Sequence, residues 1–340
     1  MRALWLGPDG PQLRTDYPEP TPGPGQALLR PTRMGVCSTD LELCRGYMGY
    51  QGVLGHEFIA VVEAIADPAH KEWVGQRVVG EINCPVGECD LCLAGLPGHC
   101  RTRTVLGILD HDGAFADRFV LPVANLHAVP DTVEDDRAVF AEPLAAAAQV
   151  LRQVDVAEAE NVTVLGDGRL GLLCAQVLAN ANPRTRCVGK HADKLELCEK
   201  WGVVRRPLRE AGLHQDQDIV VDCTGSAQGL RTALNMVRPR GTIVLKTTVA
   251  PGSAPASNAA QQKADADPRP PSSEDLARIV IDEITVVGSR CGPFDEALRM
   301  LAGHQVDVTS LITRRMPLEA GVDALRQAAA PGQIKVLLEP

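Results

Sequence analysis

A glycine-rich turn between an apolar strand and a helical pattern constrains the fold of this chain more than any other feature. Val162–Leu165 has the pattern of a buried strand, and a helix is expected over Leu170–Leu178; the turn between them reads Gly166, Asp167, Gly168, Arg169, Leu170, Gly171. In this context the first glycine allows a tight turn, the second lets a pyrophosphate approach the backbone, and the third permits close helix–sheet packing. Free N–H groups at a helix N-terminus also suit phosphate. The turn therefore predicts a dinucleotide-binding site, with a glycine-rich turn that binds no ligand as the alternative.

Strand and helix patterns alternate after this turn. The expected strands are Arg186–Val188, Asp218–Asp222, Thr242–Lys246 and Ile284–Gly288, and the expected helices are Asp193–Trp201 and Gln228–Val237. Such alternation is typical of a parallel, doubly wound sheet of the α/β class, the Rossmann fold. We assign residues 146–283 to this domain. Its Ala/Pro/Ser/Gln-rich stretch at about 250–273 is interpreted as an exposed loop insertion without function.

Residues 1–145 have a different character. They are rich in glycine and proline and contain short β-type runs at Gln26–Pro31, Phe58–Ile65 and Gln76–Ile82. These runs predict a compact, irregular β domain, which ends where a helix is expected to begin near Thr132. Residues 284–340 are expected to complete the parallel sheet and return to the β domain, with a last strand at Ile334–Leu338.

The end of the second strand of the doubly wound sheet bears on the choice of dinucleotide. A fold that prefers NAD usually has an acidic residue there, which binds the ribose 2′-hydroxyl. Here the position is Gly189, which we expect to leave room for a 2′-phosphate, and Lys190, His191 and Lys194 can supply counter-charge. The pattern therefore favours NADP over NAD. The alternative is that these cations are solvated loop residues.

Four cysteines fall within one short segment. Cys84, Cys89, Cys92 and Cys100 offer four soft ligands, the number that a closed tetrahedral zinc site needs. The residues between them are too polar and glycine-rich for a core helix. The segment predicts a structural zinc site, with His99 as a substitute ligand and unrelated free thiols as the alternative.

A second set of metal-ligand residues is dispersed along the chain. Cys37 stands in Gly-Val-Cys-Ser-Thr-Asp, His56 in Gly-His-Glu, and Glu142 in Ala-Glu-Pro-Leu. Spacing alone does not join the three, because a lone Cys or His in an apolar setting is more often part of a core.

Composition excludes several classes of function. A net charge of −9 argues against a nucleic-acid-binding surface, which needs clustered Lys and Arg. No apolar run reaches the ~20 residues that cross a bilayer, and the apolar start Met1–Leu6 is too short for a signal peptide. We expect a cytoplasmic protein whose partners are neither nucleic acid nor membrane.

Taken together, the motifs resemble the zinc-dependent branch of the medium-chain dehydrogenase/reductase family. The resemblance rests on Gly35–Asp40, Gly55–Glu57, the four-cysteine segment, Glu142-Pro143, the glycine-rich turn and Asp222–Ser226, in the family's order. It is nearest to sorbitol, threonine and glucose dehydrogenase-like members. It implies a GroES-like β domain beside the Rossmann domain. One departure is that four residues, rather than the usual two, separate Cys84 from Cys89, so Cys84 is the weakest candidate ligand.

The resemblance also implies roles for individual residues. Cys37, His56 and Glu142 would bind a catalytic zinc, Glu57 would be an alternating ligand, and Asp40 would orient His56. Thr39 would relay the substrate proton; where many members have a relay histidine, this chain has Glu42. Thr224 and Arg290 are candidates for the nicotinamide end of the cofactor, and a surface ion pair is the alternative for Arg290.

The resemblance thus predicts an oxidoreductase with two zinc ions per chain. It would move a hydride between NADP (or NAD) and an alcohol, polyol or sugar hydroxyl, or the matching carbonyl. Family members are usually homodimers or homotetramers. The alternatives are a zinc-free quinone or enoyl reductase of the same fold, disfavoured by the presence of Cys37, His56 and Glu142 together, and a non-catalytic dinucleotide-binding protein.

Overall fold

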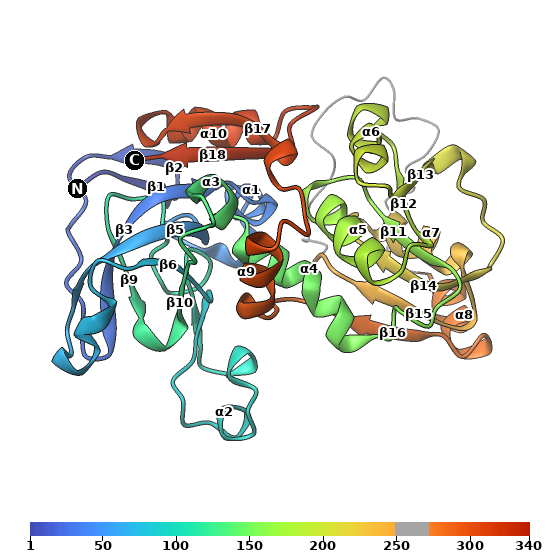
Figure 1. Cartoon of the computed structure of the whole chain (residues 1–340), viewed down its shortest axis with the longest axis horizontal. Coiled ribbons are helices and arrows are strands. Elements are labelled where there is room, and N and C mark those ends of the chain that lie inside the picture. The colour runs from blue at the N-terminus through green and yellow to red at the C-terminus, as the bar shows by residue number, and fades with distance from the viewer. Residues whose placement is uncertain (249–271) are drawn as a thin grey trace. The chain divides into compact units, whose positions relative to one another are not determined.

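The computed structural model describes residues 1–248 and 272–340, which form two compact units. The first unit comprises Met1–Ala145 and Phe294–Pro340, and the second comprises Ala146–Pro293 (Figure 1). Residues 250–271 of the expected insertion lie outside the described residues, whereas Ser272 and Ser273 cap and begin a helix.

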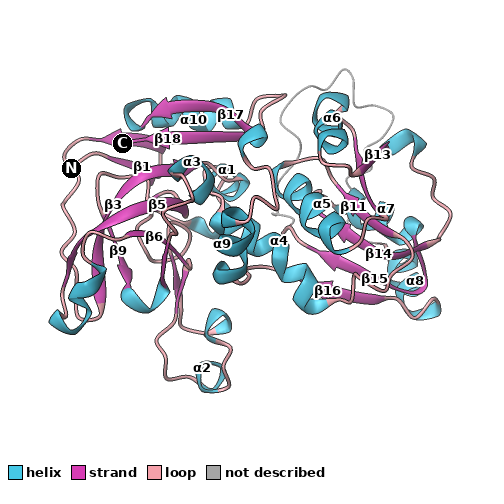
Figure 2. Cartoon of the chain, viewed as in Figure 1, coloured by secondary structure: helices cyan, strands magenta, loops and turns pink. Residues whose placement is uncertain are grey.

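A seven-stranded sheet forms the centre of the first unit, with the order β10-β6-β5-β3-β18-β17 and with β9 paired to β3 (Figure 2). Two smaller sheets have the orders β2-β1-β4 and β7-β8. The strands are β1 (Ala3–Gly7), β2 (Gly10–Arg14), β3 (Gln26–Gly35), β4 (Gly52–Val53), β5 (Glu57–Ile65), β6 (Arg77–Gly80), β7 (Asn83–Cys84), β8 (Thr104–Val105), β9 (Phe119–Pro122), β10 (Leu126–Ala128), β17 (Ile312–Pro317) and β18 (Lys335–Glu339). Alternation along β3 buries Ala27 and Leu29 and exposes Arg30, as expected for a strand with one core face.

The first unit also contains short helices. They are α1 (Ser38–Leu43), α2 (Asp90–Leu93), α3 (Asp135–Ala138), α9 (Phe294–Ala302) and α10 (Gly321–Ala328), with 3₁₀ turns η1 (Tyr47–Gly49), η2 (Pro68–Trp73), η3 (Pro97–His99), η4 (Val123–Asn125), η6 (Thr309–Leu311) and η7 (Leu318–Ala320). The long helix α4 (Ala141–Gln153) crosses the boundary between the units. The helix expected to begin near Thr132 begins slightly later: the Val133 N–H bonds to the Pro130 carbonyl in a turn, and Glu134 is the N-cap residue of α3.

The second unit contains the predicted parallel sheet. Its strand order is β13-β12-β11-β14-β15-β16, which is the 3-2-1-4-5-6 order of a Rossmann fold. The strands are β11 (Val162–Leu165), β12 (Thr185–Gly189), β13 (Val204–Pro207), β14 (Gln217–Asp222), β15 (Val237–Leu245) and β16 (Thr285–Gly288), and the helices are α5 (Arg169–Ala181), α6 (Ala192–Lys200), α7 (Ala227–Met236) and α8 (Ser273–Ile281), with the 3₁₀ turn η5 (Leu208–Glu210). Parallel registers align the carboxyl ends of the strands, since Leu165 lies opposite both Val188 and Asp222, and Leu245 opposite Gly288.

Among the described residues, no helix is both long enough and apolar enough to cross a bilayer.

Candidate functional site

Cys37, His56 and Glu57 converge in the first unit. A ligand atom of each, the Cys37 sulfur, a His56 ring nitrogen and a Glu57 carboxylate oxygen, lies within 4.8 Å of the other two. The sheet explains the meeting: Gly35 at the end of β3 pairs with Glu57 at the start of β5, and Cys37 follows two residues later as the N-cap of α1. Backbone pairing therefore brings together two segments that are distant in the sequence.

Asp40 lies behind two of these residues and is fully buried. Its Oδ2 accepts a hydrogen bond of 2.8 Å from the Cys37 N–H, and its Oδ1 lies 3.3 Å from His56 Nδ1, although the geometry of that second contact is not that of a good hydrogen bond. Burial lowers the His56 pKa, but the Asp40 carboxylate and the Cys37 thiol outweigh it, and the net pKa lies well above the usual value. Surroundings that favour a proton on a buried imidazole also favour a bound cation.

Lys335 completes this cluster, and the sequence interpretation missed it. Its ammonium forms an ion pair with Glu57, and both side chains are only 2% exposed. The ammonium also lies 3.5 Å from the Val36 carbonyl and 5.5 Å from the centre of the Phe140 ring. A Cβ on Gly35 would stand 2.5 Å from Glu57 Oε2, so a side chain at residue 35 would displace the Glu57 carboxylate from this position. The signal in the sequence was that Lys335 is the one charged residue of the expected strand Ile334–Leu338.

The other residues predicted for this site lie at different positions relative to Cys37 and His56. The Thr39 hydroxyl lies 3.7 Å from the Cys37 sulfur, which suits the predicted relay position. The group of ligand atoms within 4.8 Å of one another includes Glu57, the predicted alternating ligand, but not Glu142, which lies in the first turn of α4. The side chain of Glu42 is held by Arg45 at 2.6 Å.

The cysteine segment forms a second cluster with three members. Sulfur atoms of Cys89, Cys92 and Cys100 lie within 4.8 Å of one another. Cys84 does not join them: its sulfur lies 3.8 Å from both the Ile82 carbonyl and Asn125 Nδ2, and burial raises its pKa to about 11. A buried neutral thiol is a poor metal ligand. Conversely, a hydrogen bond with Thr102 is the largest cause that lowers the Cys100 pKa to about 6.

The glycine-rich turn has the geometry that its sequence predicts. Gly166 has a φ of +118°, which side-chain-bearing residues rarely adopt, and a Cβ on Gly171 would collide with the Gly166 carbonyl. A Cβ on Gly168 would meet nothing within 4 Å, so the backbone there is open to a ligand. Arg169 and Leu170 begin α5, whose N-terminus lies at the carboxyl edge of the sheet. In open parallel sheets ligands bind at this edge, beside the strand where the order reverses.

Asp167 fills the space beside Gly189 that the sequence suggested was open. A Cβ on Gly189 would stand 2.5 Å from Asp167 Cβ and Cγ and closer still to Oδ2. The Asp167 carboxylate also accepts a 2.6 Å hydrogen bond from the His191 N–H and lies 3.0 Å from His191 Nδ1. Lys190 is exposed and Lys194 half-buried on the segment that follows. The space that a side chain at residue 189 would occupy is therefore filled by the Asp167 carboxylate.

The last two predicted cofactor residues lie at the same edge. Thr224 follows β14; its N–H donates to Asp222 Oδ1 at 2.8 Å, and its hydroxyl lies 3.2 Å from the Ser226 hydroxyl. Arg290 follows β16 and is exposed, while its carbonyl accepts a 2.9 Å hydrogen bond from Lys246.

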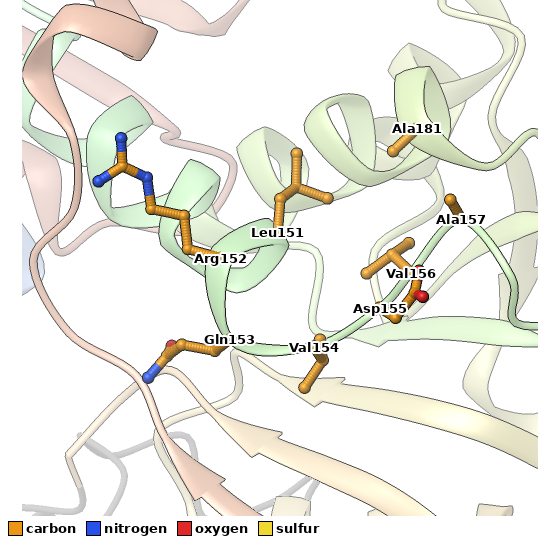
Figure 3. A pocket seen from close by; sticks show the side chains of 8 residues that line it. All are labelled: Leu151, Arg152, Gln153, Val154, Asp155, Val156, Ala157 and Ala181. Atoms are coloured by element: carbon orange, nitrogen blue, oxygen red, sulfur yellow. The ribbon is translucent and has the colours of Figure 1, made fainter.

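A surface hollow of about 450 Å³ in the second unit is lined by Leu151–Ala157 and Ala181 (Figure 3). Ala181 is the last residue of α5 and Arg169 the first. At 1.5 Å per residue, the hollow therefore lies about 18 Å along the helix from the glycine-rich turn. It is not the dinucleotide site.

Comparison with known proteins gives the family. The model of the family described as "Alcohol dehydrogenase GroES-like domain" matches residues 23–131, and that described as "Glucose dehydrogenase C-terminus" matches residues 136–339. The second match alone covers more than half of the chain. The chain belongs to the zinc-type medium-chain dehydrogenase family.

Relatives of this medium-chain dehydrogenase align over nearly its whole length. Sorbitol dehydrogenase from Halalkalibacterium halodurans is 26% identical, with 96% of this chain and 94% of the relative covered. L-threonine 3-dehydrogenase from Streptomyces avermitilis is 30% identical, with 99% and 96% covered. The crystal structure of a proposed zinc-binding dehydrogenase from Sinorhizobium meliloti 1021, bound to NADP, superposes with a TM-score of 0.82 at 26% identity and covers 100% of this chain and 99% of its own. These matches confirm the predicted family, the α/β fold with GroES-like and Rossmann domains, and the oxidoreductase class.

The family spacing described above points to the position of a fourth ligand in the cysteine cluster. Two residues usually separate the first two cysteines, and counting back from Cys89 gives Val86, which is 57% exposed. Val86 therefore stands where the first ligand would be expected.

We expect Val86→Cys to raise the zinc affinity of the cysteine cluster by roughly a hundredfold. Even the hydrogen-bond partners of metal ligands contribute tenfold to hundredfold in affinity, and here a ligand itself is added. Competition with a chromogenic chelator, in a Cys37→Ser background that removes the other cluster, would measure it. Val86→Ser is the matched control, and equal affinities in both variants would contradict the assignment of Val86 to the missing position.

Proposed function

We propose that this dehydrogenase uses zinc and NAD(P) to transfer a hydride between the dinucleotide and an alcohol, polyol or sugar hydroxyl, or the matching carbonyl. The observation that carries the proposal is the buried group of Cys37, His56 and Glu57 with Asp40 behind it. Thiolate, imidazole and carboxylate are the usual protein ligands of zinc. The negative surroundings that raise the His56 pKa support a cation in the same place.

The side chains at this site would have different roles in the reaction. When bound, zinc would polarise the substrate hydroxyl and lower its pKa, and the nicotinamide ring would exchange the hydride. Asp40 holds the Cys37 backbone and faces the His56 ring, so it orients two ligands at once. We assign the proton relay to Thr39.

Two carboxylates compete for the remaining ligand position. Glu142 is the ligand that family resemblance favours, whereas Glu57 is supported by its carboxylate oxygen, which lies within 4.8 Å of the Cys37 sulfur and a His56 ring nitrogen. Cys⁻ and one carboxylate balance Zn²⁺, whereas both carboxylates together would weaken it as a Lewis acid. We propose that Glu57 binds the metal only while Glu142 does not, with Lys335 as the partner of Glu57 in the other state.

A substrate screen tests this function. The protein would be incubated with sorbitol, other polyols, simple alcohols, aldoses and L-threonine, each with NAD and with NADP, and the absorbance of reduced cofactor followed. We expect turnover that stops after zinc is removed with a chelator and returns when zinc is added. Turnover that survives zinc removal would favour the zinc-free reductase, and dinucleotide binding without any turnover would favour the non-catalytic protein.

We also propose that the protein works in the cytoplasm. The eleven cysteines all lie within the described residues, and none forms a disulfide there, as is usual in a reducing compartment.

For assembly we propose a homodimer or homotetramer. β16 is the last strand of its sheet among the described residues, and an edge strand presents unpaired backbone groups. The preceding helix α8 exposes Leu276 by 59%, Val280 by 76% and Ile281 by 77%. Exposed apolar side chains on the helix that precedes an edge strand favour a self-complementary contact with a second copy.

We expect light scattering to give a dimer or tetramer for the wild type at micromolar concentration, and Ile281→Lys to shift it toward monomer. A buried charge without a partner is costly in an apolar contact. Leu213→Lys, at a leucine of the same unit that is 53% exposed, should leave the mass unchanged. A monomeric wild type would contradict the proposal.

A further inference from the structure

Asp167 has a place in the structure that its position in the glycine-rich turn does not explain. The turn needs its glycines, and a side chain between the first two could point to solvent. Instead Asp167 is only 7% exposed and lies against Gly189, at the end of the neighbouring strand β12. Its carboxylate therefore occupies the space where a side chain at residue 189 would otherwise lie.

That space has a known importance in dinucleotide folds. An acidic side chain at the end of the second strand hydrogen-bonds the ribose 2′-hydroxyl of NAD. This chain has no acid at the strand end, but Asp167 supplies a carboxylate there from the adjacent turn. The two positions exclude each other, because a side chain at residue 189 would collide with Asp167.

The hydrogen bonds of Asp167 leave it able to bind a further donor. It accepts from the His191 N–H at 2.6 Å, and His191 Nδ1 lies 3.0 Å from Oδ1 and 3.1 Å from Oδ2. An ionised carboxylate has about four acceptor positions, so these contacts do not exhaust it. They fix its orientation and connect the turn to the N-cap of α6.

The contacts of Asp167 with His191 also affect which nearby cations can bind a 2′-phosphate. His191 Nδ1 already faces Asp167, so the ring is not wholly available to a phosphate. Lys190 and Lys194 remain on the segment after β12, and they can attract a 2′-phosphate that the carboxylate repels. The preference for one dinucleotide is then the difference between these two effects.

We propose that Asp167 is the residue that recognises the 2′ position of the adenine ribose, accepting a hydrogen bond from a 2′-hydroxyl and disfavouring a 2′-phosphate. The proposal rests on the dinucleotide site of the proposed function. It makes NAD at least as good a ligand as NADP, against the expectation from Gly189 and the cations alone.

Binding of the two dinucleotides, measured by titration calorimetry without substrate, tests the proposal. A hydrogen bond to a charged group corresponds to about tenfold or more in affinity. We therefore expect Asp167→Asn to shift the ratio of the NADP and NAD dissociation constants at least about tenfold toward NADP. Asp193→Asn is the matched control: it removes the same charge from the exposed first turn of α6 and should leave the ratio within about twofold.

The outcomes distinguish a wrong role for Asp167 from a wrong dinucleotide site. If both dinucleotides bind and Asp167→Asn leaves the ratio unchanged while lowering the melting temperature, Asp167 only ties the turn to α6 and the proposal is overturned. If neither binds the wild-type protein, the dinucleotide site itself is wrong. Should Asp167→Asn not fold, the wild type still decides: NADP binding more than tenfold tighter than NAD would overturn the proposal, and NAD binding as tight or tighter would support it.

Discussion

Replacing Cys37 by serine is expected to remove one zinc ion per chain and to lower turnover at least about a thousandfold. A serine hydroxyl cannot replace a thiolate as a ligand, and the group would keep only His56 and a carboxylate. A catalytic metal supplies several kcal/mol of transition-state stabilisation, and each 1.36 kcal/mol is a factor of ten. Zinc content by elemental analysis, beside turnover in the screen described above, measures both effects.

Cys44→Ser is the matched control for this change. Cys44 caps the same short helix at its other end, and burial raises its pKa to about 12, so it is a neutral thiol outside the metal group. This variant should keep its zinc and most of its turnover. Equal zinc content in the Cys37→Ser and wild-type proteins, with circular dichroism unchanged in both, would exclude Cys37 as a ligand.

The parallel sheet of the second unit could be predicted because its signals are local. β11 matches the expected Val162–Leu165, and α7 (Ala227–Met236) is offset by one residue from the expected Gln228–Val237. β13 (Val204–Pro207) was missed because it is only partly buried and carries Arg205 and Arg206, so it lacks the apolar run of an inner strand. An edge strand forms because it pairs with the adjacent strand, and a local sequence pattern does not show that pairing.

The sequence predicted most of the residues of the candidate sites, but it did not show which of them contact one another. Motifs identified Cys37, His56 and Glu57, whereas Lys335 joins them only because β18 pairs with β3. Such contacts between distant segments follow from strand register and not from spacing. For the same reason, four clustered cysteines could be recognised in the sequence, but the position of the Cys84 sulfur against the core could not be predicted. Nor could the contact of Asp167 with Gly189.

The ion pair of Lys335 and Glu57 gives the largest expected effect on stability. Lys335→Met keeps an unbranched apolar chain in the same space but leaves a carboxylate that is 2% exposed without its cation. Removing one partner of a buried pair costs about 3–5 kcal/mol. We expect urea unfolding of the zinc-free protein to show a loss of this size.

The double variant Glu57→Gln with Lys335→Met decides whether the pair is the cause. The glutamine side chain carries no charge, so the double variant should recover most of the lost stability, and the coupling between the two positions should exceed about 1 kcal/mol. Lys71→Met, at an exposed lysine of the same unit, should change stability by less than about 0.5 kcal/mol. If the two single losses simply add, Lys335 stabilises the protein through its packing against Phe140 and not through the charge of Glu57, and it would then have no part in holding that carboxylate away from the metal.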